Sequence, residues 1–187
     1  LDETNPILDT QLGIGNLRAR IAIIQQPLSP DGLAYAIRRH RENPWTLPLF
    51  IKNKMINPFA AGLLSFLIDG SRTMLVAGTR SSGKTSLLGS LMLEIIPKFR
   101  VIVIEDSLEL PVESLRKLNY DILRLKVRSA LLKTTTEVSA DDGIRTSLRL
   151  GDSSLIIGEV RSTEAKALYE AMRVGALANV VAGTIHG

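Results

Sequence analysis

The chain has 187 residues, of which 45% are hydrophobic and 22% are charged. These values are typical of a globular chain with one domain and a remainder, and they argue against disorder. Cysteine is absent and there are only two histidines, which excludes disulfides, cysteine catalysis and a histidine-built metal cage. The net charge of +4 comes from scattered basic residues and does not require a nucleic-acid partner.

Membrane-spanning and targeting segments are not apparent in the sequence. The best candidate span, residues 55–68, is 14 residues long and contains Asn57 and Pro58, whereas a span needs about 20 apolar residues. The N-terminus is acidic and polar, unlike a signal peptide. Because the chain lacks an initial methionine and stops after a strand-like run, we expect a fragment of a longer protein.

The first part of the chain is the least regular. Residues 18–24 and 33–38 are predicted to be short strands, separated by a turn-forming segment rich in proline, serine and glycine. Pro44 and Pro48 bracket a predicted linker.

From about residue 49, helices and strands are predicted to alternate. Asn57-Pro58 begins a helix that Gly70 ends, with an apolar face of Phe59, Leu63, Phe66 and Leu67. Further helices are predicted over residues 85–96, from the capping pair Ser139 and Asp142 to Gly151, and over residues 162–173. Short apolar runs predict buried strands at 74–77, 101–104, 155–157 and 180–182. This alternation indicates a parallel, doubly wound α/β sheet.

A phosphate-binding loop follows the first of these buried strands. The sequence GTRSSGKT matches the pattern G-x-x-x-x-G-K-[ST] between a strand and a helix. Glycine lets the backbone curl so that its N–H groups point at phosphate oxygens, and the helix N-terminus adds partial positive charge. We predict that Lys84 reaches the β- and γ-phosphates of ATP and that the Thr85 hydroxyl binds Mg²⁺. The predicted nucleotide-binding residues are Gly78, Thr79, Arg80, Ser81, Ser82, Gly83, Lys84, Thr85 and Ser86.

Carboxylates follow two of the buried strands. Glu105, Asp106 and Glu109 come after residues 101–104, and Glu159 comes after residues 155–157. Ligands bind at the carboxyl ends of strands in open α/β sheets, so these groups are candidates for holding Mg²⁺ or activating water. A carboxylate at the end of one strand is often structural. Carboxylates at the ends of two strands, in a chain that also has a phosphate loop, favour a role in catalysis or Mg²⁺ binding. Gly158 is expected to let the backbone pass close to the nucleotide.

One histidine and several arginines remain open between two interpretations. His186 ends a third strand-like run and is either structural or a sensor of the γ-phosphate. Arg38 lies in a basic run that is either a solvated edge or an arginine finger reaching a neighbouring subunit, a role for which Arg18 and Arg20 compete. The basic segment 117–133 is interpreted as solvated surface.

Four motifs in order resemble the secretion-superfamily ATPases, which power type II and type IV secretion, pilus and archaeal flagellum assembly. They are the loop GTRSSGKTS, the Asp box VIVIEDSLELP, the Walker B region LRLGDSSLIIGEVRSTEA and the His box AGTIHG. The phrase ALYEAMRVGALANVVAGTIHG is similar to the archaeal branch. The resemblance covers roughly residues 15–187.

The resemblance implies a RecA-like P-loop NTPase core over residues 48–187 with a mostly parallel, doubly wound sheet. Residues 1–47 would be the C-terminal part of a smaller α/β N-terminal domain plus a linker. By motif, Glu159 is the Walker B glutamate acting on Mg²⁺ or water, and the Asp box supplies a water-activating glutamate. The remaining candidates by motif are the His-box histidine His186 and two arginines near the nucleotide or subunit boundary, Arg161 and Arg38.

The resemblance further implies a Mg²⁺-dependent ATPase that works as a homohexamer and drives an integral membrane platform protein. It would lie in the cytoplasm at the inner face of the cell membrane, with no nucleic acid and no span of its own. Asp152-Ser153 departs from the Pro-Asp of many bacterial members, and the zinc-binding tetracysteine is missing, so no zinc is expected. Two alternatives are a RecA-like nucleic-acid-dependent motor and a nucleotide-gated scaffold without turnover. A small-molecule kinase is disfavoured because no arginine-rich lid is apparent.

Overall fold

The computed structural model describes the chain except for residues 15–16, 42, 128–137, 161–163, 175–178 and 187. The chain forms two compact units, one made of Leu1–Asn43 and the other beginning at Pro44.

The first unit is a three-stranded antiparallel sheet in the order β1-β2-β3. Strand β2 (Leu17–Ile24) and strand β3 (Ala34–Arg39) confirm the two strands expected from the sequence. Strand β1 (Ile7–Ile14) was not predicted, although its ILDTQLGI sequence partly alternates apolar and polar residues as a half-buried strand does.

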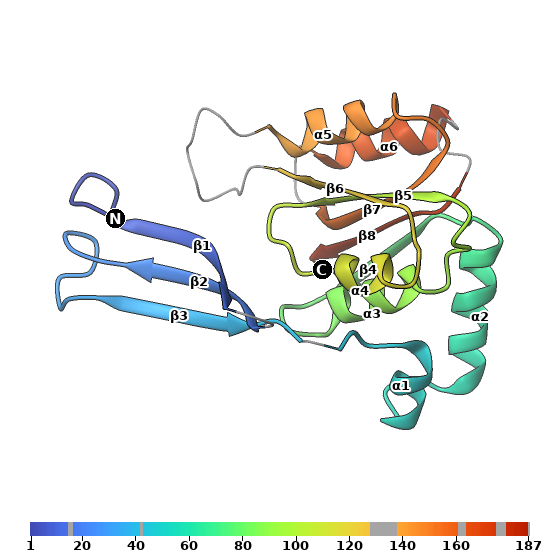
Figure 1. Ribbon diagram of the computed structural model, residues 1–187, viewed down its shortest axis with the longest axis horizontal. Coiled ribbons are helices and arrows are strands. Elements are labelled where there is room, and N and C mark those ends of the chain that lie inside the picture. Colours follow the sequence, from blue (N-terminus) through green and yellow to red (C-terminus); the bar gives the residue numbers. More distant parts are fainter. Residues whose placement is uncertain (15–16, 42, 128–137, 161–163, 175–178, 187) are drawn as a thin grey trace. The chain divides into compact units, whose positions relative to one another are not determined.

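The second unit contains a five-stranded sheet in the order β4-β8-β7-β5-β6, and every neighbouring pair is parallel (Figure 1). The predicted parallel α/β sheet is therefore confirmed. Strand β6 was not expected, because its segment had been interpreted as solvated surface. The strands are β4 (Met74–Gly78), β5 (Arg100–Glu105), β6 (Ile122–Lys126), β7 (Ser153–Val160) and β8 (Val181–His186).

Helices cover both faces of this sheet. One face carries the helices α5 (Ala140–Ser147) and α6 (Glu164–Val174), which lie together above the strands in Figure 1. The other face carries α1 (Leu47–Lys52), α2 (Pro58–Asp69), α3 (Lys84–Met92) and α4 (Val112–Arg116). The sheet is thus doubly wound, as the alternating pattern predicts.

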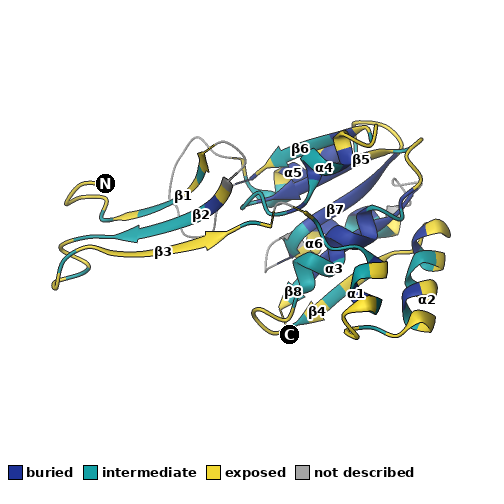
Figure 2. Cartoon of the chain, turned by 60° about the horizontal axis from the view of Figure 1, so that its bottom comes forward, coloured by how far each residue is buried: buried dark blue, intermediate teal, exposed yellow. Residues whose placement is uncertain are grey.

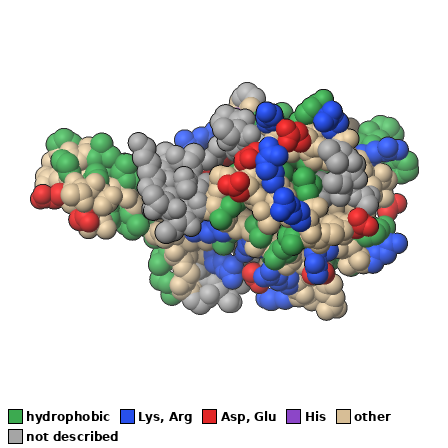
Figure 3. All heavy atoms as spheres, turned by 90° about the horizontal axis from the view of Figure 1, so that it is seen from above, with side chains coloured by type: hydrophobic (Ala, Val, Ile, Leu, Met, Phe, Trp, Pro, Cys, Tyr) green, Lys and Arg blue, Asp and Glu red, His purple; other side chains and the backbone are tan. Residues whose placement is uncertain are grey.

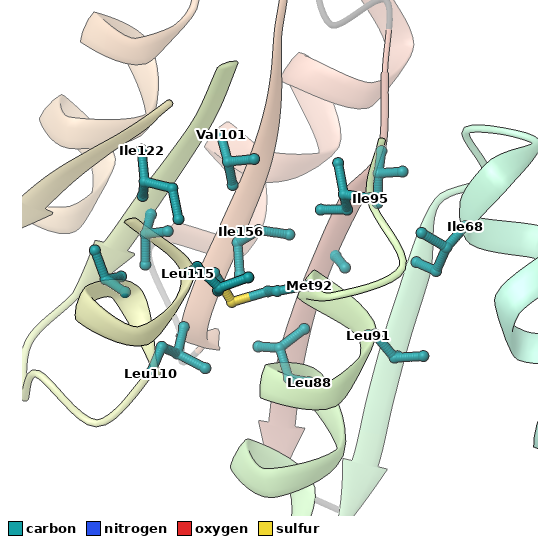
Figure 4. Close-up of a cluster of buried hydrophobic side chains, with 14 of the residues drawn as sticks. Ile68, Leu88, Leu91, Met92, Ile95, Val101, Leu110, Leu115, Ile122 and Ile156 are labelled. Atoms are coloured by element: carbon teal, nitrogen blue, oxygen red, sulfur yellow. The ribbon is translucent and has the colours of Figure 1, made fainter. Parts of the chain in front are cut away.

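Two apolar clusters, one on each face, form the core. Figure 4 shows the cluster between the sheet and α2, α3 and α4, in which Leu88, Leu115 and Ile156 are among the residues that meet. The opposite cluster joins Ile104 and Ile157 to residues of α5 and α6. Strands β5 and β7 are largely buried (Figure 2), which explains the continuous apolar runs VIVI in β5 and LII in β7.

The helix α2 has the predicted ends but a different buried face. The Asn57 side chain accepts a hydrogen bond of 2.7 Å from the Ala60 N–H, as an N-cap should. However, Phe59 and Phe66 are 81% and 71% exposed, and Leu63 is also exposed. Ala61, Leu64 and Ile68 pack into the core instead. The expected apolar face was wrong because α2 carries apolar residues on more than one side, and only the packing against the sheet selects between them.

Helix α3 ends at Met92, earlier than the predicted residue 96, and residues 93–94 form a turn. Among the helices that the structure describes, none combines the length and the apolar character needed to cross a bilayer.

A pair of substitutions within α2 tests which face is buried. Ile68→Ala removes a side chain that is 2% exposed, and we expect it to lower the free energy of unfolding by about 2–5 kcal/mol. Phe66→Ala truncates an exposed side chain and should change it by only about 0.5 kcal/mol. Chemical denaturation of the two variants measures this difference. A larger loss for Phe66→Ala than for Ile68→Ala would contradict the assignment of the faces.

Candidate functional site

The predicted site residues of the second unit follow four neighbouring strands at one edge of the sheet. β4 ends at Gly78, which is paired in register with His186 of β8. Glu159 lies near the end of the next strand, β7, and Glu105 ends the strand after that, β5. Because all four strands are parallel, their carboxyl ends meet at this edge.

The phosphate loop forms a tight turn between β4 and α3. A Cβ atom on Gly78 would lie 2.6 Å from the Ser82 Oγ atom, so a larger residue there would force the Ser82 side chain to move. Gly83 caps α3 with a φ of 89°, a left-handed conformation that favours glycine. These two positions explain the fixed glycines of the motif.

The Lys84 side chain folds back over this loop. Its Nζ atom donates a hydrogen bond of 2.8 Å to the Thr79 carbonyl. Thr85 and Ser86 follow Lys84 in the first turn of α3, a helix of nine residues. The positive end of the helix dipole and a lysine ammonium group are therefore held at the same loop, an arrangement that suits an anion.

Glu105 lies inside the protein at the end of β5 rather than on the surface. It is 3% exposed. Its Oε1 atom accepts hydrogen bonds of 2.8 Å from the backbone N–H groups of both Glu109 and Leu110. Burial raises the pKa of Glu105, while these hydrogen bonds and the nearby Arg124 partly offset this effect. Glu105 thus holds the segment that carries Glu109.

Arg124 of β6 is the main residue that the sequence analysis missed. Its Nε atom lies 3.5 Å from Oε2 of Glu105, and its side chain is only 12% exposed. Its Nη2 atom donates a hydrogen bond of 2.9 Å to the Leu110 carbonyl. The available signal was an arginine within the apolar run ILRL, which is typical of a strand and not of a solvated surface.

Gly158 of β7 faces Glu105. A Cβ atom on Gly158 would lie 3.1 Å from the Glu105 Cγ atom. Glycine at this position therefore permits a close approach to a carboxylate side chain of the neighbouring strand, and the expected approach to a nucleotide stays a prediction.

Glu159 and His186 form a direct pair across β7 and β8. Their Oε1 and Nε2 atoms are 2.8 Å apart, and the side chains are 23% and 53% exposed, respectively. The structure thus brings together two residues that the sequence could place only at separate strand ends.

The remaining predicted residues are placed as follows. Asp106 directly follows β5, and Arg38 is an exposed residue of β3 in the first unit. Arg20 is held by Asp9, with its Nε atom 2.9 Å from Oδ1, whereas the Arg18 residue is exposed. Arg161 lies outside the described residues.

Among the residues that are described, no three His, Asp or Glu side chains cluster in a way that could hold a metal ion.

The family model for type II/IV secretion system proteins matches residues 8–187. The chain therefore belongs to the type II/IV secretion system protein family.

Curated relatives are similar to this chain over its whole length. The chain is 28% identical to a putative conjugal transfer protein of Mycobacterium tuberculosis, over 100% of this chain and 52% of that protein. It thus spans about half the length of the curated relatives it matches.

Two solved structures share the fold. One is the DotB ATPase of Legionella pneumophila, with a TM-score of 0.64 and 19% identity, covering 98% of this chain and 48% of that chain. The other is the VirB11 ATPase of the Brucella suis type IV secretion system in complex with sulphate. It has a TM-score of 0.57 and 22% identity, covering 100% of this chain and 59% of that chain.

Replacing Glu105 tests its structural role. Glu105→Ala leaves two buried N–H groups without an acceptor, which should lower the free energy of unfolding by about 1–3 kcal/mol for each. Glu113→Ala is the control, because Glu113 also faces Arg124, at 3.6 Å, but is 45% exposed. It should change the stability by less than about 1 kcal/mol. Equal losses in the two variants, measured by denaturation, would contradict the role.

The raised pKa of Glu105 predicts a pH dependence. The folded chain holds this proton at a higher pH than the unfolded chain, in which the ordinary value of 4.5 applies. The stability of the unsubstituted chain relative to Glu105→Gln should therefore be greatest below that ordinary value. It should fall as the pH rises through the raised pKa, and denaturation at a series of pH values measures it. A relative stability that increases with pH would contradict the prediction.

Proposed function

We propose that this chain carries the nucleotide site of a Mg²⁺-dependent ATPase subunit of a type II/IV secretion system. The observation that supports the proposal most strongly is the arrangement along one sheet edge. The phosphate loop, His186, Glu159 and the Glu105–Glu109 segment follow the neighbouring strands β4, β8, β7 and β5 in that order.

The phosphate loop would bind the β- and γ-phosphates of ATP. Backbone N–H groups of residues 78–86 and the N-terminus of α3 would donate to phosphate oxygens, and Lys84 would leave the Thr79 carbonyl to reach them. The close packing of Gly78 on Ser82 keeps the loop compact enough to surround a phosphate group. Electrostatic stabilisation of the transition state by such groups is usually the largest contribution to the catalysis of phosphoryl transfer.

The residues present also suit a magnesium ion. The Thr85 hydroxyl and the Glu159 carboxylate are oxygen ligands of the kind that Mg²⁺ prefers. When bound beside the phosphates, Mg²⁺ neutralises charge that develops on them. Thr85 in the first turn of α3 and Glu159 on β7 would hold it together with the nucleotide.

Two carboxylates are candidates to orient the attacking water. Glu109 belongs to the segment that Glu105 and Arg124 hold in place, while Glu159 is fixed by its contact with His186. The Glu105 carboxylate is buried and already bound to the backbone of residues 109 and 110 and paired with Arg124. We therefore propose that Glu105 holds Glu109 in place and that Glu109 contacts the water. His186 would respond to the γ-phosphate through Glu159.

Arginines would complete the charge stabilisation. Arg38 and Arg161 are the proposed residues, by their motifs. Arg20 pairs with Asp9, so a role as an arginine finger would require it to leave that carboxylate.

The assembly proposed for the complete protein is a homohexamer at the inner face of the cell membrane, where it would act on an integral membrane platform protein. The family assignment supports this picture. Residues 1–47 would belong to a preceding domain and residues 48–187 to the ATPase core. The relation to the archaeal branch stays a prediction.

A nucleic-acid-dependent motor is the main alternative. Figure 3 shows acidic and basic side chains intermixed on the face that α5 and α6 cover. There Arg145 pairs with both Asp141 and Glu170. This mixing does not favour a phosphate backbone as the partner on that face, because such partners bind clustered positive charge.

Lys84→Ala in the complete protein tests the proposal. Because Lys84 would stabilise the charge on the transferred phosphate, its loss should reduce phosphate release by about 100-fold or more. Lys98→Ala is the control, since Lys98 lies outside the phosphate loop. ATP turnover that persists in Lys84→Ala would exclude the proposed site. Turnover that requires added DNA would favour the nucleic-acid motor, and bound ATP without phosphate release in the unsubstituted protein would favour the scaffold.

A further inference from the structure

The pairing of β7 with β8 is irregular at one point, near the carboxyl edge of the sheet. The strands pair regularly up to Ile157 and Gly183, and pairing resumes at Val160 and Ile185. Between these points β7 advances three residues and β8 only two. One extra residue is therefore inserted in β7, at Gly158 and Glu159. Such a bulge is rare in parallel pairs, and bulges occur often beside functional sites.

The extra residue changes which side chains face the core. Leu155 and Ile157 alternate along β7 and both pack in the cluster under α5 and α6. In a regular strand, residue 159 would face the same cluster, because side chains alternate with a period of two. In this chain Val160 takes that place and is 4% exposed. The bulge thus keeps the Glu159 carboxylate out of the apolar core.

The same insertion directs Glu159 toward His186. The Glu159 side chain is 23% exposed and its Oε1 atom lies 2.8 Å from the His186 Nε2 atom. The position of this carboxylate therefore depends on how firmly the bulge is held.

Thr184 holds the bulge from the β8 side. Its hydroxyl donates a hydrogen bond of 2.6 Å to the Gly158 carbonyl, and the residue is 2% exposed. Thr184 lies between the paired residues Gly183 and Ile185, opposite the inserted segment. A side-chain donor thus takes up a carbonyl group at the point where the regular backbone pairing is interrupted. Because Thr184 itself is buried, loss of its hydroxyl would leave this carbonyl without that donor.

Glu105 supports the bulge from the β5 side. The space beside Gly158 is closed by the Glu105 Cγ atom, 3.1 Å from where a Cβ atom would stand. Gly158 is therefore confined between a side chain of β5 and the hydroxyl of Thr184. The bulge has little room to relax while both contacts are in place.

We propose that Thr184 is a positioning residue whose hydroxyl holds the β7 bulge and thereby fixes the Glu159 carboxylate beside His186. The geometric part of this proposal stands on the contacts above, and its effect on turnover rests on the proposed ATPase function. Thr184 acts through Glu159 and does not itself contact the nucleotide.

A matched pair of variants of the complete protein tests the hydroxyl. Thr184→Val keeps the branched shape but removes the donor, and Thr184→Ser keeps the donor but removes the methyl group. We expect kcat for ATP hydrolysis to fall about 10- to 100-fold in Thr184→Val, with KM changed less than about twofold. Thr184→Ser should retain most of the turnover. Equal kcat values for Thr184→Val and the unsubstituted protein, or equal losses in both variants, would overturn the proposal.

A structural measurement separates this proposal from the proposed function. In crystal structures, the contact between Glu159 Oε1 and His186 Nε2 should persist in Thr184→Ser and be lost in Thr184→Val. This comparison needs no ATP turnover, so it remains decisive if the unsubstituted protein does not hydrolyse ATP. Retention of the contact in Thr184→Val would overturn the proposal. Thr184→Ala, which also lacks the hydroxyl, replaces Thr184→Val if the latter does not fold.

A double variant tests whether Thr184 acts through Glu159. If it does, Thr184→Val should cause little further loss of kcat in a protein that already carries Glu159→Gln. Independent losses that multiply in the double variant would show that Thr184 acts by another route and would overturn the proposal.

Discussion

The parallel pairing of four strands is the constraint on which the candidate site depends. β4, β8, β7 and β5 are hydrogen-bonded neighbours, although other elements separate them in the sequence. Parallel pairing turns all their carboxyl ends to the same edge of the sheet. Residues as far apart in the sequence as Gly78 and His186 therefore meet there. The apolar clusters on both faces make this arrangement stable, because β5, β7 and β8 are largely buried between the helices, whereas β4, the last strand on its side of the sheet, is partly exposed. The site residues themselves contribute few of these apolar contacts.

A second constraint is the buried carboxylate of Glu105. It links the end of β5 to the backbone of residues 109 and 110, to Arg124 of β6 and to Gly158 of β7. A charged group is costly to bury unless it is paired and hydrogen-bonded, and here one side chain satisfies several needs at once. The consequence is that the segment carrying Glu109 and the bulge carrying Glu159 are both fixed by contacts to the same residue.

Much of the fold could be predicted from local patterns. The helix cap at Asn57, the capping pair at Ser139, and the strands β4, β5, β7 and β8 depend on residues close together in the sequence. Strand β6 was not predicted, because the basic residues of segment 117–133 were given more weight than the apolar residues of ILRLK. The predicted buried face of α2 was also wrong, since apolar residues lie on more than one side of that helix.

The sequence by itself determined the phosphate loop, most of the alternating strands and helices around it, and which residue types stand at the strand ends. Only the tertiary structure decided what those residues do to one another. It buried Glu105 against Arg124, paired Glu159 with His186, and placed the Thr184 hydroxyl on the carbonyl of a residue 26 positions away. The physical reason is that such contacts depend on which strands pair and in which register. A single inserted residue in β7 changes that register, and Gly158 is a local sign of such a bulge that does not by itself say which side chains it redirects.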